Sequence, residues 1–152
     1  MTVITNLKSL YEIDFNQWLE ETIDRLQANR FNELDLANLI EELEALGRSD
    51  KNAVESLLEQ VIRHLLLLEY WSKEFEYNKF HWQAEITGFR NQLKRQLTSN
   101  LRNHLIKELS SLYQDALAYV RQKTGLEVDF PTECPYTIEE LLDINWFPTN
   151  LT

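Results

Sequence analysis

Apolar residues recur every three to four positions along most of the chain, which is the spacing that places side chains on one face of an α-helix. The chain has only three glycines and three prolines, fewer than the frequent turns of a β-sandwich or barrel require. The sequence therefore predicts an all-α protein, a bundle of four to five main helices followed by an irregular C-terminal segment with one short helix. The apolar stripes run over residues 15–26, 36–46, 54–65, 82–97 and 101–120.

Capping residues indicate where several of these helices begin and end. Asp14 is an acceptor suited to a helix N-terminus, and the first helix is predicted from about Phe15 to Asn29. Thr98 has the same capping chemistry before the last long stripe. Gly125 follows that stripe, and glycine commonly ends a helix.

The middle of the chain leaves two alternatives open. Gly47 either ends the second helix, or one long helix continues through it and is only weakened there. Further on, Leu65 to Leu68 are apolar nearly all round the helix. A turn with no polar face is expected at the centre of a fold.

The segment 126–152 contains Pro131 and Pro135, which break regular structure, and then Thr137 with Glu140, the capping box of a short helix. It has six acidic and no basic residues, yet it carries several large apolar side chains. We therefore expect it to dock rather than to extend as a free tail. Residues 1–152 are predicted to form a single helical domain, with an N-terminal arm at 1–13 and the docked tail at 126–152.

The composition favours a folded protein of the cytoplasm. The residues are 43% hydrophobic and 26% charged, unlike the polar composition of disordered chains. The one cysteine, Cys134, has no partner for an intramolecular disulfide, and the N-terminus lacks the pattern of a secretory signal. No apolar run is long enough to cross a bilayer, so no membrane association is expected.

The formal charge of −10 disfavours binding to nucleic acid and to anionic lipid, because the field of the molecule repels both. The charges are nevertheless unevenly distributed. A basic strip contains no acid between its first and last members, and it is the candidate site for a nucleic-acid interaction or for docking of the acidic tail. The strip consists of Arg90, Lys94, Arg95, Arg102 and Lys107.

The order and spacing of several motifs resemble an uncharacterised family, the domain of unknown function 29 family, which is abundant in cyanobacteria. The resemblance implies an all-helical intracellular protein. It brings no catalytic residue, because no activity is established for the family. It is carried by Leu10 to Phe15 with Trp18 and Leu19, Asp35-Leu36 and Leu39 to Glu44, His64-Leu65-Leu66, Trp82 with Ile86 and Arg90, and Cys134-Pro135.

Two histidine–carboxylate pairs are candidate metal ligands. His81 with Glu85 and His104 with Glu108 each stand four residues apart, so each pair shares one helix face, and Asp115 continues the second strip. Such strips can bind a divalent ion, but they are more often solvated flanks of a helix. We expect that the two strips do not converge, and no cofactor is expected.

Three further polar residues are candidates for the interior. His64 lies among apolar neighbours and is expected to be a neutral histidine bonded to a carboxylate or a carbonyl. Glu42 and Glu44 flank an apolar stripe, and one of them is a candidate partner for His64 or Arg63. Cys134 has no nearby base in the sequence and is expected to be an inert thiol.

No phosphate-binding loop, zinc-type cysteine cluster or nucleophile elbow occurs in the sequence. Catalytic residues are therefore unknown, and we expect no catalysis. The function that we predict is a protein–protein interaction module, with an unidentified protein partner or a second copy in a homodimer. The alternatives are nucleic-acid binding through the strip from Arg90 to Lys107, and a divalent-metal-dependent enzyme that uses the histidine–carboxylate strips.

Overall fold

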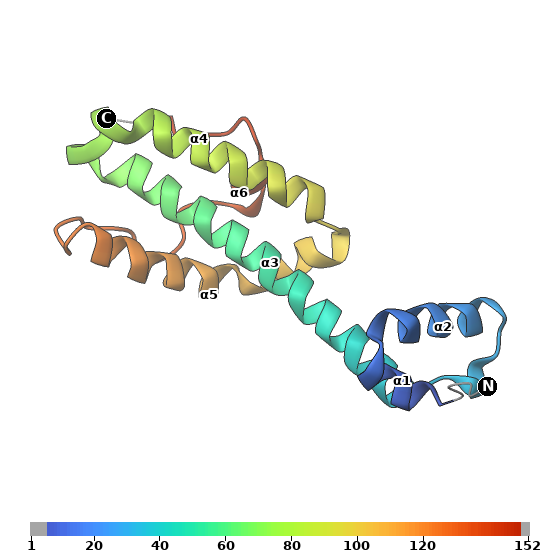
Figure 1. Ribbon diagram of the computed structural model, residues 1–152. Helices are drawn as coiled ribbons and strands as arrows, with labels where there is room; N and C mark the ends of the chain where they lie inside the picture. Colours follow the sequence, from blue (N-terminus) through green and yellow to red (C-terminus); the bar gives the residue numbers. More distant parts are fainter. Residues whose placement is uncertain (1–5, 150–152) are drawn as a thin grey trace. The chain divides into compact units, whose positions relative to one another are not determined.

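The computed structural model describes residues 6–149, and its regular elements are helices (Figure 1). No strand occurs among these described residues, and the all-α prediction is confirmed. None of the described helices combines the length and the apolar composition needed to cross a membrane. The elements are α1 (Leu7–Ile13), α2 (Phe15–Gln27), the 3-10 helix η1 (Phe31–Glu33), α3 (Leu36–Tyr70), α4 (Ser72–Gln96), α5 (Ser99–Lys123) and α6 (Ile138–Leu142).

Close contacts divide the chain into two compact units, unit 1 (Met1–Ser49) and unit 2 (Asp50–Thr152). Unit 1 holds α1, α2, η1 and the first turns of α3, and unit 2 holds the rest of α3 with α4, α5 and α6. The predicted N-terminal arm at 1–13 contains α1, while its residues 1–5 lie outside the described part of the chain. That residues 1–152 form a single domain stays a prediction.

The backbone conformation of each glycine explains which of them ends a helix. Gly125 follows α5 with φ 68°, and Asn29 follows α2 with φ 59°, so both take the left-handed conformation that closes a helix C-terminus. Gly47 has no such positive φ, and α3 continues through it. The long-helix alternative is therefore the observed one, and Gly47 weakens α3 without ending it.

Replacement of Gly47 by alanine is expected to raise the free energy of unfolding by about 0.5 to 1 kcal/mol, because alanine loses less conformational freedom in a helix. A Cβ added at this position meets no atom within 4 Å. Gly125→Ala is the matched control, and it should lower stability because alanine is strained at a positive φ. The measurement is urea unfolding of the three proteins, and a loss of stability in Gly47→Ala would contradict a continuous helix at this point.

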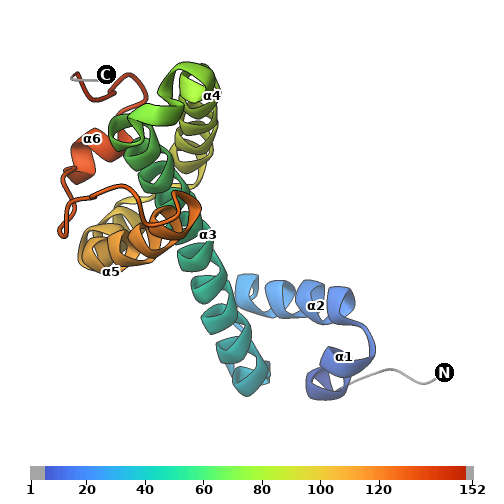
Figure 2. The same ribbon diagram turned by 90° about the vertical axis from the view of Figure 1, so that its left-hand side faces the viewer.

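The core of unit 2 forms around α3, which lies between α4 and α5 in both ribbon views (Figure 1 and Figure 2). The turn from Leu65 to Leu68 is at most 1% exposed, so its predicted central position is confirmed. The helices on either side contribute apolar side chains to the same cluster, including Phe75, Trp82, Ile86 and Leu93 of α4 and Leu105, Tyr113, Ala116 and Val120 of α5.

The segment after α5 packs against this core, and its apolar side chains Phe130, Tyr136, Ile138 and Leu141 are buried. The predicted capping box opens α6, with the Thr137 hydroxyl accepting from the backbone of Glu140. Buried hydroxyl groups hold the segment at two further points. Tyr113 donates to the carbonyl of Pro131 at 2.5 Å, and Tyr136 donates to the Glu69 carboxylate at 2.8 Å.

Unit 1 has a much smaller core, made by the buried side chains Leu7, Leu10 and Trp18. Two hydrogen bonds join α1 and α2 to the start of α3. The Trp18 indole donates to Asp35 at 3.2 Å, and the Tyr11 hydroxyl donates to Glu42 at 2.5 Å. These contacts join the first turns of α3 to the rest of unit 1. Several large apolar side chains of α2 and α3 nevertheless stay exposed on unit 1.

Candidate functional site

The main candidate site is a set of exposed apolar side chains on unit 1. On α2 and on the first turns of α3 these side chains follow helical spacing, and we call them the α2 stripe and the α3 stripe. Side chains of the α2 stripe are 40–45% exposed, and those of the α3 stripe are 54–59% exposed. The α2 stripe consists of Phe15, Leu19, Ile23 and Leu26, and the α3 stripe consists of Leu36, Ile40, Leu43 and Leu46.

The local sequence explains why these stripes are not the core of unit 1. The side chains that turn inward, Trp18 of α2 and Leu39 of α3, occupy the helix positions next to the stripes. Trp18 is completely buried and packs edge to face against the ring of Tyr11, with centroids 5.0 Å apart. One large indole thus fills the small core, and the residues at the neighbouring positions stay on the surface.

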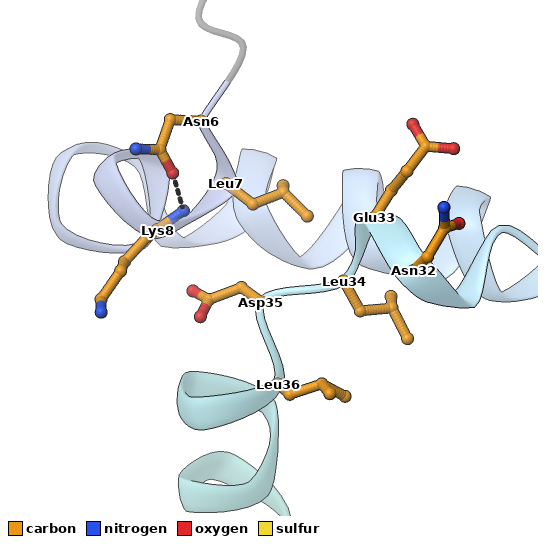
Figure 3. A pocket seen from close by; sticks show the side chains of 8 residues that line it. All are labelled: Asn6, Leu7, Lys8, Asn32, Glu33, Leu34, Asp35 and Leu36. Atoms are coloured by element: carbon orange, nitrogen blue, oxygen red, sulfur yellow. Dashed lines mark hydrogen bonds between the residues drawn. The ribbon is translucent and has the colours of Figure 1, made fainter.

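A pocket of about 440 Å³ lies at one end of the α3 stripe (Figure 3). This open pocket is bordered by the start of α1 and by the connection from η1 to α3. Leu7, Leu34 and Leu36 supply its apolar lining, and Lys8 and Asp35 supply charged groups. Since Leu36 also begins the α3 stripe, the pocket extends the apolar surface into a hollow that can accept a side chain.

The charges of unit 1 are mostly acidic. Two of its arginines are held in short ion pairs on their own segment, Arg25 with Glu21 at 2.8 Å and Arg30 with Glu33 at 2.5 Å. Hydrogen bonding to Glu42 and burial raise the pKa of Tyr11 to about 12, so this hydroxyl keeps its proton at neutral pH. The sequence alone gave Glu42 a role beside His64 or Arg63, whereas the structure pairs it with Tyr11.

The predicted metal ligands do not form one centre. Among the described residues no group of three or more histidine, cysteine, aspartate or glutamate side chains is placed to hold a metal ion. His104 instead contacts Glu55 of α3, with its Nε2 atom 2.5 Å from the carboxylate. Glu85, Glu108 and Asp115 have no part in this contact.

His64 is half-buried, and its Nδ1 lies 2.7 Å from the carbonyl oxygen of Gln60. Because a carbonyl only accepts, Nδ1 carries the hydrogen and Nε2 offers a lone pair. A pocket of about 380 Å³ is lined by this ring and by His81, Trp71 and Lys123 among others. Glu44 is exposed, and it is not among the residues that line this pocket.

The free energy of unfolding is expected to decrease as the pH falls below about 6.5, the usual pKa of histidine. Burial lowers the pKa of His64 in the folded chain, while Glu85 opposes this shift and His81 and Arg63 add to it. As the pH falls, His64 is therefore protonated in the unfolded chain at a higher pH than in the folded chain. The free energy of unfolding decreases until the pH falls below the lowered pKa of the folded chain. His64→Gln should reduce this slope in urea unfolding between pH 5 and 8. His81→Gln should change the slope less, because His81 is a smaller cause of the lowered pKa than burial.

The structure separates the basic strip into different roles. Arg90 is 1% exposed and donates to three backbone carbonyls of the C-terminal segment, those of Leu141 at 2.9 Å, Glu140 at 2.9 Å and Trp146 at 2.6 Å. Arg102 lies 3.6 Å from the Glu139 carboxylate. Lys94, Arg95 and Lys107 are exposed. Arg90 of the strip therefore contacts backbone carbonyl groups of the C-terminal segment, and Arg102 is the strip residue that approaches one of its acidic side chains.

Cys134 is half-buried, and its thiol lies 3.4 Å from the carbonyl of Tyr136. Burial raises the pKa of this thiol. A raised pKa keeps sulfur in the protonated form, which is a poor nucleophile.

Sequence reasoning missed two features of these sites. The exposed state of the α2 and α3 stripes had no signal in the periodicity, because a stripe for a partner and a stripe for the core have the same spacing. The burial of Arg90 did have a signal. It stands four residues after Ile86 and eight after Trp82, which places it on the buried stripe of α4.

No curated protein and no solved structure matches the chain significantly. A family model matches residues 10–147, and its description is "Domain of unknown function DUF29". This match covers nearly the whole chain and both units. The chain therefore belongs to the DUF29 family, as the motifs from Leu10 to Pro135 indicate.

Proposed function

We propose that this protein is a protein-binding module whose α2 and α3 stripes receive an apolar segment of another protein. The observation that carries the proposal is the exposure of eight large apolar side chains at helical spacing on unit 1. Single exposed leucines are normal on a protein surface, but a row of exposed apolar side chains along one helix face is an apolar patch, and such patches mark interaction sites.

The energetic argument starts from the exposed fractions. Burial of apolar surface contributes about 25 cal/mol for each Å² removed from water. Each residue of the α3 stripe has more than half of its surface still exposed, so a partner that covers this stripe gains free energy that the isolated chain leaves unused. Helix–groove complexes use anchors at this spacing of three and four residues.

Photocrosslinking in the native host tests the proposal. A photoreactive phenylalanine analogue at Leu43, which is 59% exposed, should give a discrete crosslinked protein. The same analogue at Tyr77 of α4, which is 85% exposed, is the control for an exposed apolar position elsewhere, and it should not give this product.

The crosslinked protein supports the proposal only if its purified form binds the purified chain and loses this binding when Leu19 and Ile40 are both replaced by glutamine. Leu19 is 41% and Ile40 is 54% exposed, and neither belongs to the buried core of unit 1, so these substitutions should leave the fold intact. Unchanged binding of the partner by this double variant, or the absence of any crosslinked product at Leu43, would contradict the proposal.

Nucleic-acid binding through the basic strip is the second function that the sequence suggests, and we expect that the protein does not bind nucleic acid. Burial of Arg90 and the contact of Arg102 with Glu139 leave Lys94, Arg95 and Lys107 as the exposed members of the strip. A labelled DNA or RNA oligonucleotide should bind at low salt no more tightly than about 100 μM, the weak end of nonspecific affinity. Tight, salt-sensitive binding that Lys94→Glu with Arg95→Glu abolishes would show this expectation to be wrong.

A further inference from the structure

We infer that the partner of unit 1 presents a basic amphipathic helix, with an apolar face for the stripes and lysine or arginine beside that face. The inference rests on the proposed function and adds the chemistry of the partner. The evidence for it is the negative charge around the stripes and the ion pairs that hold two of the basic residues of unit 1.

Unit 1 has ten acidic and four basic residues, a formal charge of −6. Two of its four bases, Arg25 and Arg30, are held by Glu21 and Glu33. The other two, Lys8 and Arg48, are outnumbered by the remaining eight acids of the unit. The surface that surrounds the stripes is therefore electronegative.

Particular acids stand beside the stripes. Glu20 precedes Ile23 by three residues, and Glu44 follows Ile40 by four, so each shares a helix face with a stripe residue. Glu20, Glu41 and Glu44 are exposed, and no ion pair within residues 6–149 joins any of them to a base. A partner with bases at the edge of its apolar face meets these carboxylates.

This charge also decides between possible occupants. A second copy of unit 1 would bring another −6 against the first, and like charges at an interface are unfavourable. An anionic membrane surface is disfavoured for the same reason. A basic helix is attracted, and electrostatic complementarity both accelerates association and selects the partner.

The spacing of the stripes matches helical recognition. Ile40 and Leu43 of α3 are separated by three residues, and Leu36 and Ile40 by four, which is the interval at which the leucines of an amphipathic partner recur. The pocket at Leu36 provides a hollow for one anchor residue, with Asp35 among its lining residues. Apolar burial then supplies affinity, and the acids supply the preference for a basic partner.

Designed peptides test the inference with the full-length chain. The first is a labelled peptide of 18 residues with leucine at helical spacing and lysine at the other positions. The second has glutamate in place of lysine, and the third has the composition of the first with the leucines moved off a common face. In fluorescence anisotropy at about 150 mM salt we expect the first to bind at least about tenfold more tightly than either of the others, a difference of about 1.4 kcal/mol.

Two sets of variants separate the stripes from general attraction by an acidic protein. Leu19→Gln with Ile40→Gln and Leu43→Gln should lower affinity for the first peptide by about tenfold or more, whereas Tyr77→Gln with Phe80→Gln on α4 should not. Glu20→Gln with Glu41→Gln and Glu44→Gln should lower the affinity several-fold and reduce its salt dependence, because fewer charges are screened.

The outcomes distinguish the inference from the proposed function. Equal binding of the lysine and glutamate peptides through the stripes would overturn the basic partner and leave a protein-binding module. Binding of the lysine peptide that survives the stripe substitutions would overturn the inference as well, because the attraction would then be nonspecific. A crosslinked homodimer at Leu43, with a dimer in sedimentation, would replace the basic helix by a second copy. Failure of every peptide to bind would also overturn the inference. The proposed function would then still be tested independently by photocrosslinking at Leu43.

Discussion

Replacement of Arg90 by alanine is expected to lower the free energy of unfolding by about 3 kcal/mol or more, because a buried acceptor left without its donor costs about 1 to 3 kcal/mol. The Arg90 side chain donates from Nε, Nη1 and Nη2 to three different carbonyl oxygens. Its substitution would leave these acceptors without their donor and would create a cavity beside α6.

The position of these carbonyls makes the arginine important for the C-terminal segment. Glu140 and Leu141 belong to α6, a helix of five residues. The last carbonyls of a helix have no partner within it, so α6 depends on Arg90 for acceptors that a longer helix satisfies partly by itself. Burial lowers the pKa of Arg90 to about 10, and the group therefore remains charged at neutral pH.

Urea unfolding of Arg90→Ala, Arg90→Lys and Lys94→Ala measures the effect. The lysine variant should recover only part of the loss, because an ammonium group cannot reproduce the planar fork of a guanidinium. Lys94 is exposed one turn further along α4 and should change stability by less than about 0.5 kcal/mol. A loss below about 1 kcal/mol for Arg90→Ala would show that the carbonyl contacts do not hold the segment.

The helices could be predicted because their signals are local. Asp14 accepts a hydrogen bond from the backbone of Gln17, Thr98 accepts one from Leu101, and Thr137 forms its capping box. Capping and periodicity concern residues three or four apart, so one sequence contains the whole interaction. Gly47 was ambiguous because the choice depends on φ, and both the helical and the left-handed conformation are open to glycine.

The partners of the polar side chains could not be predicted in the same way. His104 contacts Glu55, which is 49 residues away, and Tyr136 donates to Glu69, which is 67 residues away. A helical period identifies which residues share a face, but it does not give the rotation of one helix against another. The two histidine strips were therefore visible in the sequence, whereas the carboxylate that meets His104 was not.

The candidate docking surface shows a different limit. The stripes of α2 and α3 have the same helical spacing as the stripe from Val54 to Leu65, most of which is buried in unit 2. An apolar stripe predicts that one face of a helix packs against another apolar surface. It does not show whether that surface belongs to the same chain or to a partner. Only the packing shows that Trp18 fills the core of unit 1 and that Ile40 and Leu43 stay exposed.

Replacement of Trp18 by alanine is expected to lower the free energy of unfolding of unit 1 by about 3 to 5 kcal/mol, the range for deleting a buried aromatic side chain. Unit 1 should then unfold. Trp18 is the largest of the three buried side chains in this core. Its indole also donates to Asp35 and stacks on Phe15, with ring centroids 5.6 Å apart. Few other buried contacts are available to offset the loss.

Hydrogen exchange measured by mass spectrometry locates the effect of Trp18→Ala along the chain. Amides of α1 and α2 should lose protection, while those of α4 and α5 in unit 2 keep it, because their apolar cluster does not include Trp18. Ile23→Ala is the matched control on α2, since its side chain is 45% exposed, and it should change stability by less than about 1 kcal/mol. Equal loss of protection in α2 and α5 would show that the two units unfold together, as the single domain predicted for residues 1–152 requires. Selective loss in α1 and α2 would show that unit 1 is a separate cooperative element, held together mainly by one tryptophan.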